Sequence, residues 1–269
     1  MKRGAFAKVK KLSFLILAVI LTMTLVACSI KTTKKINVST EHHHWSYDES
    51  TGPEKWGELG EANLVCVNGN EQSPINLEHS LVIEDTDYEG HQIDYEPTTF
   101  ALQNNGYTVQ ADATIETSRI VVEGEEYKLA QFHFHTPSEH QFNGKHFDME
   151  LHLVHKNKND ELAVIGLMIK AGEENEILAP LWDALPSEKT KEEDAQKYLI
   201  DLEALLPQNQ TSFHYDGSLT TPPCTEEVDW IIFEQPIEMS EEQVQAFKGI
   251  FSENNRPVQP LNEREIIKK

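Results

Sequence analysis

Alternating hydrophobic and polar residues recur along the chain over lengths typical of β-strands. Six segments show this pattern or an unbroken apolar run, and they are rich in β-branched and aromatic residues. Successive side chains of a strand point to opposite faces of its sheet, so alternation predicts strands with one face in a core. The predicted strands are Tyr107–Ala111, Arg119–Val122, Lys128–His135, Glu150–His155, Leu162–Lys170 and Val228–Phe233.

Helical patterns are fewer. Two of the three end shortly before a proline, which cannot continue a helix. The third begins with Ser240 and Gln243 at the spacing of a capping box. The predicted helices are Glu174–Ala184, Ala195–Leu205 and Ser240–Ser252.

The segment 41–269 shows no low-complexity stretch, internal repeat or linker. Its length suits one large β-rich domain as well as two small ones, and the lack of a linker favours one. We therefore predict a mainly β (α+β) fold: a single domain around a large, mostly antiparallel sheet with short peripheral helices.

The first 27 residues have the features of an export signal. Residues 1–11 carry five basic side chains and no acidic one, and an uncharged apolar run follows from Leu12 to Ala27. A retained transmembrane helix is the alternative, but this run is shorter than the roughly 20 residues that cross a bilayer core. Its end, LVAC, resembles the lipobox of bacterial lipoproteins, in which the cysteine is acylated. This predicts a signal peptide over 1–27, lipidation of Cys28, a tether over 28–40, and a protein anchored by lipid to the extracytoplasmic face of a membrane.

The chain has three cysteines, and an odd number in an exported protein needs an explanation. If Cys28 carries lipid, Cys66 and Cys224 remain. An oxidising compartment would allow them to form a disulfide, which contributes about 2–4 kcal/mol. Two buried free thiols are the alternative.

The formal net charge is −22, and removal of the basic signal peptide would make the chain more acidic still. Nucleic acid binding depends on basic side chains that neutralise phosphates, so nucleic acid is excluded as a partner. The acidic residues are spread along the chain and identify no substrate.

Two predicted strands carry histidines at a spacing that suits a metal ion. Side chains two residues apart share a face of the strand, so His133 and His135 project the same way. In the next histidine-bearing strand Glu150 and His152 share a face, and His155 lies on the opposite one. His152 is the natural third ligand, because three neutral imidazoles and an open position are the donor set of catalytic zinc. The spacing alone leaves open that these histidines are merely hydrogen-bonded or solvent-facing.

The sequences around these histidines resemble the α-carbonic anhydrases. The resemblance rests on QFHFHTPSEH, ELHLVH and SLTTPPCTE, and HHWSY, GPEKW, QSPIN, NNG, LAVIG and NNRPVQPL follow in the family's order. It extends over nearly the whole segment from His43 to the C-terminus. It implies a single domain around a twisted, mostly antiparallel sheet, with Zn²⁺ at the bottom of a conical cleft. The implied reaction is the reversible hydration of carbon dioxide to bicarbonate and a proton, by attack of zinc-bound hydroxide.

The same resemblance implies a metal centre. His133, His135 and His152 match the family's three zinc ligands. Gln131 and Glu150 match the groups that accept hydrogen bonds from ligand imidazoles and fix their orientation.

It also implies catalytic and substrate-binding residues. Thr220 matches a threonine whose hydroxyl accepts a hydrogen bond from the zinc-bound hydroxide and donates one to Glu139. Thr221 lies beside it in the expected substrate site. The matching apolar wall for carbon dioxide consists of Val154, Val164, Leu219 and Trp230.

One position departs from the pattern of fast family members, which use a histidine directly after an Asn-Asn-Gly stretch as proton shuttle. Here that stretch, residues 104–106, is followed by Tyr107. An ordinary phenol has a pKa near 10 and an imidazole near 6.5, so we predict that Tyr107 is a poor shuttle. Proton export would then limit turnover, with His43 or His44 at the cleft rim as a weak substitute.

Two other functions are compatible with parts of the sequence. A non-catalytic relative usually lacks a zinc ligand, whereas all three are present here; a surface metal site at Glu41–His44 is the second alternative. The expected partners are carbon dioxide, bicarbonate and, through the lipid, a membrane, and the protein is expected to be a monomer or a homodimer. The histidines with no matching ligand role, expected to be structural or exposed, are His140, His146, His155 and His214.

Overall fold

The computed structural model describes residues 44–85 and 88–269, and these belong to one compact unit, His42–Lys269. The predicted signal peptide, Cys28 and the tether lie outside the described residues, as do residues 41–43. No helix of the described part is long and apolar enough to cross a membrane.

The strands of the described residues form one twelve-stranded sheet and a separate pair of short strands, β1 and β8. All six predicted strands are present. The strands are β1 (Asn76–Leu77), β2 (Val82–Glu84), β3 (His91–Asp94), β4 (Thr98–Asn104), β5 (Val109–Ala113), β6 (Arg119–Val122), β7 (Glu125–His135), β8 (Gln141–Phe142), β9 (Met149–Lys156), β10 (Leu162–Ala171), β11 (Gln196–Ile200), β12 (Ser212–Ser218), β13 (Glu226–Met239) and β14 (Ile266–Lys268).

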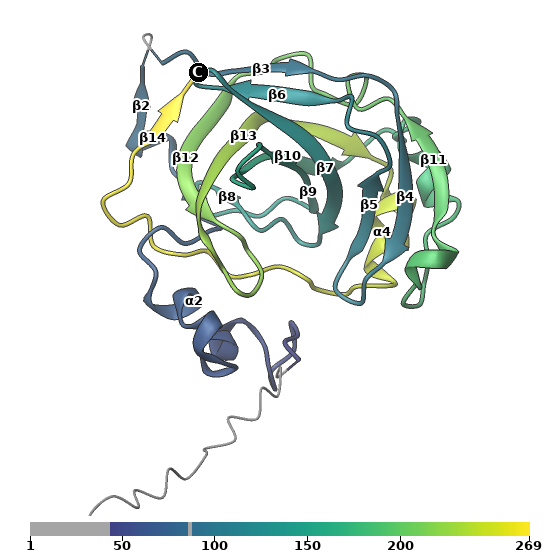
Figure 1. Cartoon of the computed structure of the whole chain (residues 1–269), viewed down its shortest axis with the longest axis horizontal. Helices are drawn as coiled ribbons and strands as arrows, with labels where there is room; N and C mark the ends of the chain where they lie inside the picture. Colours follow the sequence, from purple (N-terminus) through teal and green to yellow (C-terminus); the bar gives the residue numbers. More distant parts are fainter. Residues whose placement is uncertain (1–43, 86–87) are drawn as a thin grey trace, which may run out of the picture. The chain divides into compact units, whose positions relative to one another are not determined.

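The strand order along the sheet is β11-β4-β5-β7-β9-β10-β13-β12-β14-β2, with β6 paired to β7 and β3 to β6. Neighbours in this sheet are antiparallel except for β10 with β13 and β14 with β2. Figure 1 shows the strong twist of the sheet, with β3 and β6 lying across its upper side in that view. The prediction of a large, mostly antiparallel sheet is confirmed.

The helices are short and lie outside the sheet. One prediction is confirmed in detail: Ser240 caps α4, its Oγ accepting from the Gln243 amide at 3.2 Å while Gln243 Oε1 accepts from the Ser240 amide at 3.0 Å. The helices are α2 (Val65–Asn68), α3 (Ala179–Trp182) and α4 (Glu241–Lys248), with 3₁₀ segments at Pro53–Glu58, Glu61–Asn63, His79–Leu81 and Glu192–Asp194.

The predicted helix Glu174–Ala184 is much shorter in the structure. Only α3 is helical, and Pro180 lies in its first turn. A proline has no amide hydrogen to donate and is tolerated only at the start of a helix, so the helix cannot extend to Glu174. The residues before α3 are held instead by Asn175, whose amide donates to Gln243 Oε1 and whose side-chain amide donates to the Glu238 carbonyl.

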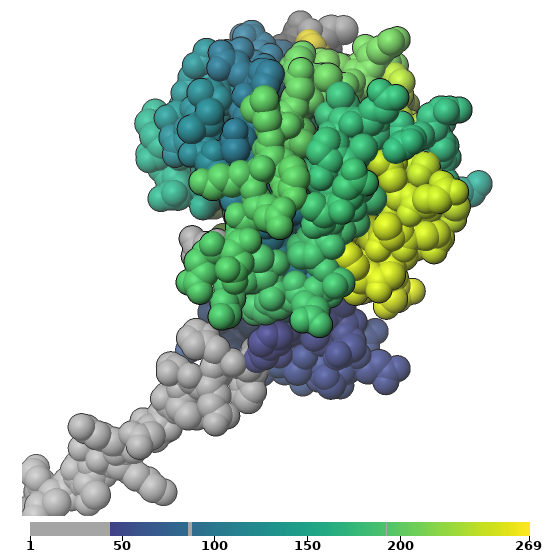
Figure 2. Space-filling model, turned by 90° about the vertical axis from the view of Figure 1, so that its right-hand side faces the viewer, coloured from purple at the N-terminus to yellow at the C-terminus, as the bar shows by residue number. Residues whose placement is uncertain are grey.

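The predicted helix Ala195–Leu205 is wrong. Gln196–Ile200 forms strand β11, which pairs antiparallel with β4 at the edge of the sheet. Leu199 points outward and is 67% exposed, whereas Ile200 is buried, which is strand alternation rather than a helical stripe. The backbone hydrogen bonds offered by the free edge of β4 decided the structure of this segment. Figure 2 shows the green segments around β11 next to the yellow ones on one face of the molecule.

The turn between β4 and β5 shifts the start of β5 to a later residue than the sequence predicts. Gly106 has φ +92°, a conformation open to glycine, and Asn105 Oδ1 accepts from the amides of Tyr107 and Thr108. Tyr107 therefore belongs to this turn, and the strand predicted from residue 107 begins at Val109.

The sheet separates two hydrophobic clusters, which confirms the alternation read from the sequence. Phe132, Phe134, Leu151 and Leu153 of β7 and β9 lie in the larger cluster, together with side chains of β4 to β6 and α4. On the other face Val154 belongs to a smaller cluster with side chains of β10, β12 and β13. His133 and His135 of β7 and His152 of β9 point to this second face, whereas His155 of β9 points to the first.

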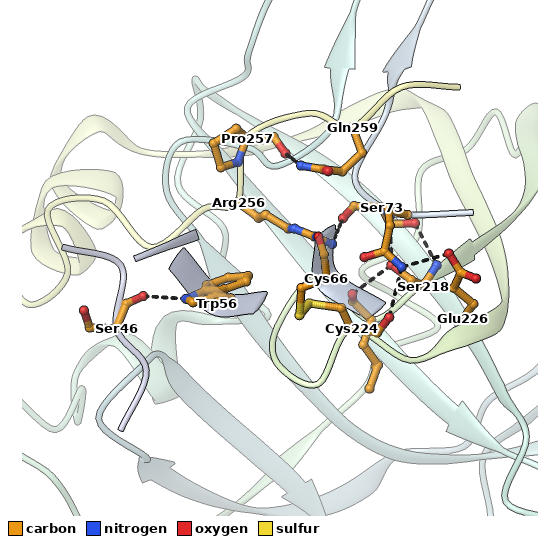
Figure 3. The surroundings of a disulfide bond; sticks show 12 residues. Ser46, Trp56, Cys66, Ser73, Ser218, Cys224, Glu226, Arg256, Pro257 and Gln259 are labelled. Carbon is orange, nitrogen blue, oxygen red and sulfur yellow. Dashed lines mark hydrogen bonds between the residues drawn. A yellow bond between two sulfur atoms is a disulfide. The ribbon is translucent and has the colours of Figure 1, made fainter. Parts of the chain in front are cut away.

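The segment before β1 is attached to the sheet by a disulfide between Cys66 and Cys224 (Figure 3). The predicted pairing is therefore present, and a disulfide is typical of proteins exported to an oxidising compartment. Arg256, 1% exposed, donates from its guanidinium to the carbonyls of Cys66 at 2.8 Å and Ser73 at 2.7 Å, and it lies over the ring of Trp56.

Candidate metal centre and substrate cavity

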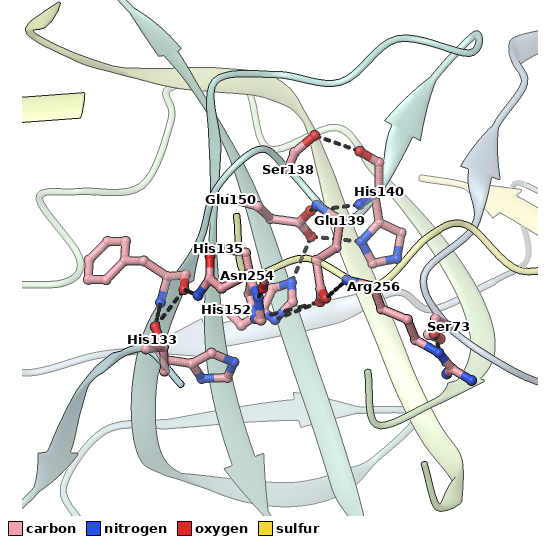
Figure 4. Close-up of polar contacts among 12 residues, drawn as sticks. Ser73, His133, His135, Ser138, Glu139, His140, Glu150, His152, Asn254 and Arg256 are labelled. Carbon is pink, nitrogen blue, oxygen red and sulfur yellow. Dashed lines mark hydrogen bonds and ion pairs between the residues drawn. The ribbon is translucent and has the colours of Figure 1, made fainter. Parts of the chain in front are cut away.

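Three histidines converge on the second face of the sheet, where β7 and β9 are antiparallel neighbours (Figure 4). His133 and His152 are directly paired across the two strands, and His135 follows two residues after His133. One ring nitrogen from each lies within 4.8 Å of the other two. The structure therefore brings together the three side chains that the parity argument grouped.

The second nitrogen of each of these imidazoles is engaged in a hydrogen bond to an oxygen. His133 Nδ1 donates to Gln131 Oε1 at 2.9 Å, His135 Nδ1 to the Asn254 carbonyl at 2.7 Å, and His152 Nε2 to Glu150 Oε1 at 2.7 Å. Because a carbonyl or carboxylate oxygen can only accept, these bonds assign the tautomers. The lone pairs of His133 Nε2, His135 Nε2 and His152 Nδ1 all remain free to bind a metal.

The remaining polar atoms also fit a cation. His135 Nε2 and Glu139 Oε2 are buried without a hydrogen-bond partner among the described residues. Burying such groups unpaired costs about 1–3 kcal/mol each, which a metal and its ligands would offset. Three imidazole nitrogens suit zinc.

A second group of possible ligands, His140, Glu150 and His152, lies beside the first. Glu150 Oε1 already accepts from both histidines, and Oε2 accepts from the amides of Glu139 and His140 at 2.8 Å each. These four bonds use the accepting positions of the carboxylate. Glu150 therefore orients side chains and is not a ligand.

Burial favours the neutral form of His133 and His135. It holds the pKa of His133 well below 6.5, and the neighbouring rings of His135 and His152 lower it further. Burial also lowers the pKa of His135, although the nearby charge of Glu139 offsets part of that effect. The free lone pairs are thus available over the neutral pH range.

The carboxylate of Glu139 lies next to the three histidines, and Figure 4 shows it pointing toward them. It is fully buried; Oε1 accepts from the Arg256 amide at 2.8 Å, and Oε2 lies 3.5 Å from His135 Nε2. One oxygen of Glu139 is therefore held by backbone, and the other faces the site.

The histidines lie in a cavity of about 150 Å³. Val154, Val164 and Trp230 form a row of directly paired residues across β9, β10 and β13, which places three apolar side chains side by side. Leu219, Thr220 and Thr221 also line the cavity. All the predicted substrate-binding residues are thus brought together with the histidines.

Thr220 is in the predicted place, but its predicted hydrogen bond is not formed in the described structure. Its side chain is 5% exposed and lines the cavity. Glu139 Oε2, the acceptor predicted for the Thr220 hydroxyl, has no partner among the residues described. The relay between them remains a prediction.

Tyr107 lies at the cavity, stacked on Trp45 with the ring centroids 3.7 Å apart. The ring of His44 also stacks on Tyr107, and His44 Nε2 lies 3.2 Å from the Tyr107 hydroxyl. Burial raises the pKa of Tyr107 above 10, so its hydroxyl keeps its proton at neutral pH. Of the two histidines expected as weak substitutes for the shuttle, His44 thus lies beside Tyr107, whereas His43 lies outside the described residues.

The other histidines are structural or exposed, as predicted. His140, His155 and His214 are buried and hydrogen-bonded, and His146 is exposed. A larger cavity, of about 950 Å³, shares only Trp230 with the predicted site residues. The chemistry of the side chains, rather than the size of the cavity, identifies the site.

Two functional groups were missed by the sequence reasoning, the Asn254 carbonyl on His135 and the Arg256 amide on Glu139. Both are backbone atoms, which leave no residue-type signature in a sequence. The only signal was the stretch NNRPVQPL, which follows the family's order but points to no individual atom.

Comparisons with known proteins agree with this site. A family model described as eukaryotic-type carbonic anhydrase matches residues 51–269. Carbonic anhydrases of Klebsiella pneumoniae and of a Nostoc species are 43% and 41% identical, each over 83% of this chain and over 90% and 85% of their own lengths. The solved structure of the α-carbonic anhydrase of Thermovibrio ammonificans with the inhibitor sulfanilamide matches with a TM-score of 0.78 and 41% identity, over 83% of this chain and 98% of that one.

Proposed function

Because the chain belongs to the α-carbonic anhydrase family, whose enzymes catalyse the zinc-dependent hydration of carbon dioxide, we propose that His133, His135 and His152 hold its zinc. The observation that carries this assignment is the convergence of three free imidazole nitrogens within 4.8 Å. The orientation of each ring is fixed by a hydrogen bond from its second nitrogen, to Gln131, Glu150 or the Asn254 carbonyl.

When bound, zinc supplies a Lewis acid that makes hydroxide available near neutral pH. Neutral ligands leave the full charge of the ion in place, which a carboxylate ligand would reduce. The chain contributes orientation: the three hydrogen bonds behind the rings keep the lone pairs aimed at one point. Glu139 Oε2 offers an acceptor to the hydroxyl of Thr220, and Thr220 in turn positions the attacking oxygen.

The row formed by Val154, Val164 and Trp230, with Leu219 beside it, gives carbon dioxide an apolar surface next to the histidines. Carbon dioxide is small and carries no net charge, so exclusion of water rather than hydrogen bonding would hold it there. Thr221 adds a polar group at the edge of this surface.

Stopped-flow measurement of carbon dioxide hydration by the purified protein tests the proposal. We expect activity that is lost when a chelator removes the metal and that returns when one equivalent of zinc is added. A protein that binds zinc at these histidines without hydrating carbon dioxide would instead be a non-catalytic member of the fold.

We further propose that export of the proton limits turnover. Each hydration releases a proton that must reach bulk solvent, and Tyr107, protonated at neutral pH, accepts it poorly. His44, 3.2 Å from the Tyr107 hydroxyl, is the titratable group placed to carry part of it.

Imidazole-type buffers are therefore expected to raise kcat with little change in kcat/KM, and Tyr107→His should give the same gain without added buffer. His44→Ala should lower kcat at low buffer concentration, because it removes the only rim imidazole that contacts Tyr107 in the described residues. A native enzyme that is insensitive to buffer, together with a Tyr107→His variant that is no faster, would contradict this account.

The lipid anchor is a separate proposal, supported by the LVAC sequence and by the Cys66–Cys224 disulfide, which suits an extracytoplasmic location. Mass spectrometry of protein extracted from membranes is expected to show an acylated N-terminal Cys28. A mature protein that begins upstream of Cys28 and is recovered without detergent would contradict the anchor.

A further inference from the structure

A chain of hydrogen bonds leads from the metal centre into the protein interior. From His152 it passes through Glu150 Oε1 to His140 Nδ1, with both contacts at 2.7 Å. His140 Nε2 then lies 2.6 Å from the Tyr215 hydroxyl, which lies 2.8 Å from Ser73 Oγ. We call these five residues the His152–Ser73 chain.

The hydrogen bonds of this chain converge on Glu150, which accepts from His152 on one side and from His140 on the other. Glu150 can only accept, so His140 Nδ1 donates to it and His140 Nε2 accepts from the Tyr215 hydroxyl. The Tyr215 oxygen then accepts from the Ser73 hydroxyl. Glu150 and Tyr215 thus favour the same His140 tautomer, with Glu150 accepting from Nδ1 and the Tyr215 hydroxyl donating to Nε2.

The far end of the chain is firmly anchored. Ser73 and Ser218 are joined twice, by the Ser73 amide to Ser218 Oγ at 2.8 Å and by the Ser218 amide to Ser73 Oγ at 3.0 Å. Ser218 also accepts from Trp230 Nε1 through its carbonyl at 3.0 Å. The segment that leads into Leu219 and Thr220 therefore serves as the fixed point of the chain.

All five side chains are buried; Tyr215, the most exposed, is 5% exposed and also lines the larger cavity. Packing around them is also tight: a Cβ built at Gly217 would lie 2.3 Å from Ser73 Oγ and 2.8 Å from the Tyr215 ring. The loss of one hydroxyl would leave His140 Nε2 unpaired, with little room for the neighbours to rearrange.

We propose that Tyr215 is a positioning residue of the metal centre, which acts through His140 and Glu150 to hold the His152 ring in its zinc-binding orientation. This inference rests on the proposed function, in which His152 is a zinc ligand. Tyr215 does not line the cavity that holds the three histidines, and its ring, which the phenylalanine variant would keep, stacks on Trp230 with the centroids 6.3 Å apart. Its effect should appear in how tightly zinc is held.

The test compares zinc release from the zinc-loaded wild-type protein and a Tyr215→Phe variant in excess chelator. Phenylalanine keeps the ring and removes only the hydroxyl. We expect release to be about 3- to 10-fold faster, below the 10- to 100-fold loss of affinity that is typical when a direct partner of a ligand is removed. The release rate is read from the zinc–chelator complex, without reference to activity.

Tyr95→Phe is a matched control. The Tyr95 hydroxyl lies 2.7 Å from His155 Nε2, and both residues are buried, so the variant loses the same kind of tyrosine–histidine bond. His155 is on the same strand as His152 but faces the opposite side of the sheet. Both variants should melt at a lower temperature, but only Tyr215→Phe should release zinc faster.

Equally faster zinc release in the two variants would mean that a general loss of rigidity is responsible. Unchanged zinc release in Tyr215→Phe would mean that the Tyr215 hydroxyl does not act on His152. Either result overturns the inference. If Tyr215→Phe does not fold, Ser73→Ala removes the donor to the Tyr215 oxygen and is measured in the same way, and an unchanged release rate there also overturns it. A wild-type protein that binds no zinc would contradict the proposed function instead, so the two failures are distinguishable.

Discussion

Replacing His133, His135 or His152 by alanine is expected to remove most of the bound zinc and nearly all carbon dioxide hydration. Two imidazoles cannot hold a tetrahedral ion that needs three protein ligands and an open position. The free nitrogens lie within 4.8 Å of one another, and each variant would leave only two of them. Metal content measured by atomic absorption, together with stopped-flow rates, checks this expectation.

His155→Ala serves as the control for this set. His155 is fully buried on β9 and bonded to Tyr95, so its removal should lower the melting temperature. Because it faces away from the site, the variant should retain one zinc and its activity. Full zinc occupancy in any of the three ligand variants would show that the ligands are assigned to the wrong residues.

Thr220→Ala is expected to keep its zinc but to lose about 10²-fold in kcat, the order found when one positioned hydrogen-bond partner of a reacting oxygen is removed. Thr220→Ser, which keeps the hydroxyl, should retain most of the rate. Glu139→Gln should be impaired to a similar degree. The side-chain oxygen of glutamine can still accept from the Arg256 backbone amide, but its side-chain nitrogen cannot accept a hydrogen bond from the Thr220 hydroxyl.

Metal content and melting temperature measured on the same variants separate lost orientation from lost structure. Rates equal to wild type in both Thr220→Ala and Glu139→Gln would mean that the attacking oxygen is not oriented by this pair. A rate loss that followed zinc loss would place the effect at the metal instead.

The metal centre was predictable because it depends on strand parity. His133, His135 and His152 share a face as a direct result of their spacing, and His155 is excluded from that face for the same reason. Pairing of His133 opposite His152 could not be derived from spacing, since it depends on which strands become neighbours. The family resemblance supplied that information.

The failures occurred where tertiary contacts outweighed local preference. Residues 195–205 have the composition of a helix, but the open edge of β4 offered backbone partners and the segment became β11. The helix predicted from Glu174 fails for a local reason instead, because Pro180 is tolerated only in the first turn of α3. The contacts made by the backbone groups of Asn254 and Arg256 could not be predicted from the sequence, because every residue carries the same backbone atoms.

Those two backbone contacts bear on the order in which the site assembles. His135 and Asn254 are 119 residues apart in sequence, so the strand pair that carries the three histidines can form before its last orienting partner arrives. Loop-closure entropy makes such distant contacts late events in folding. A zinc ion captured early would meet a His135 ring still free to rotate, and Glu139 would lack its backbone donor. The final orientation of the His135 ring is therefore reached only when the C-terminal segment returns to β7, late in folding.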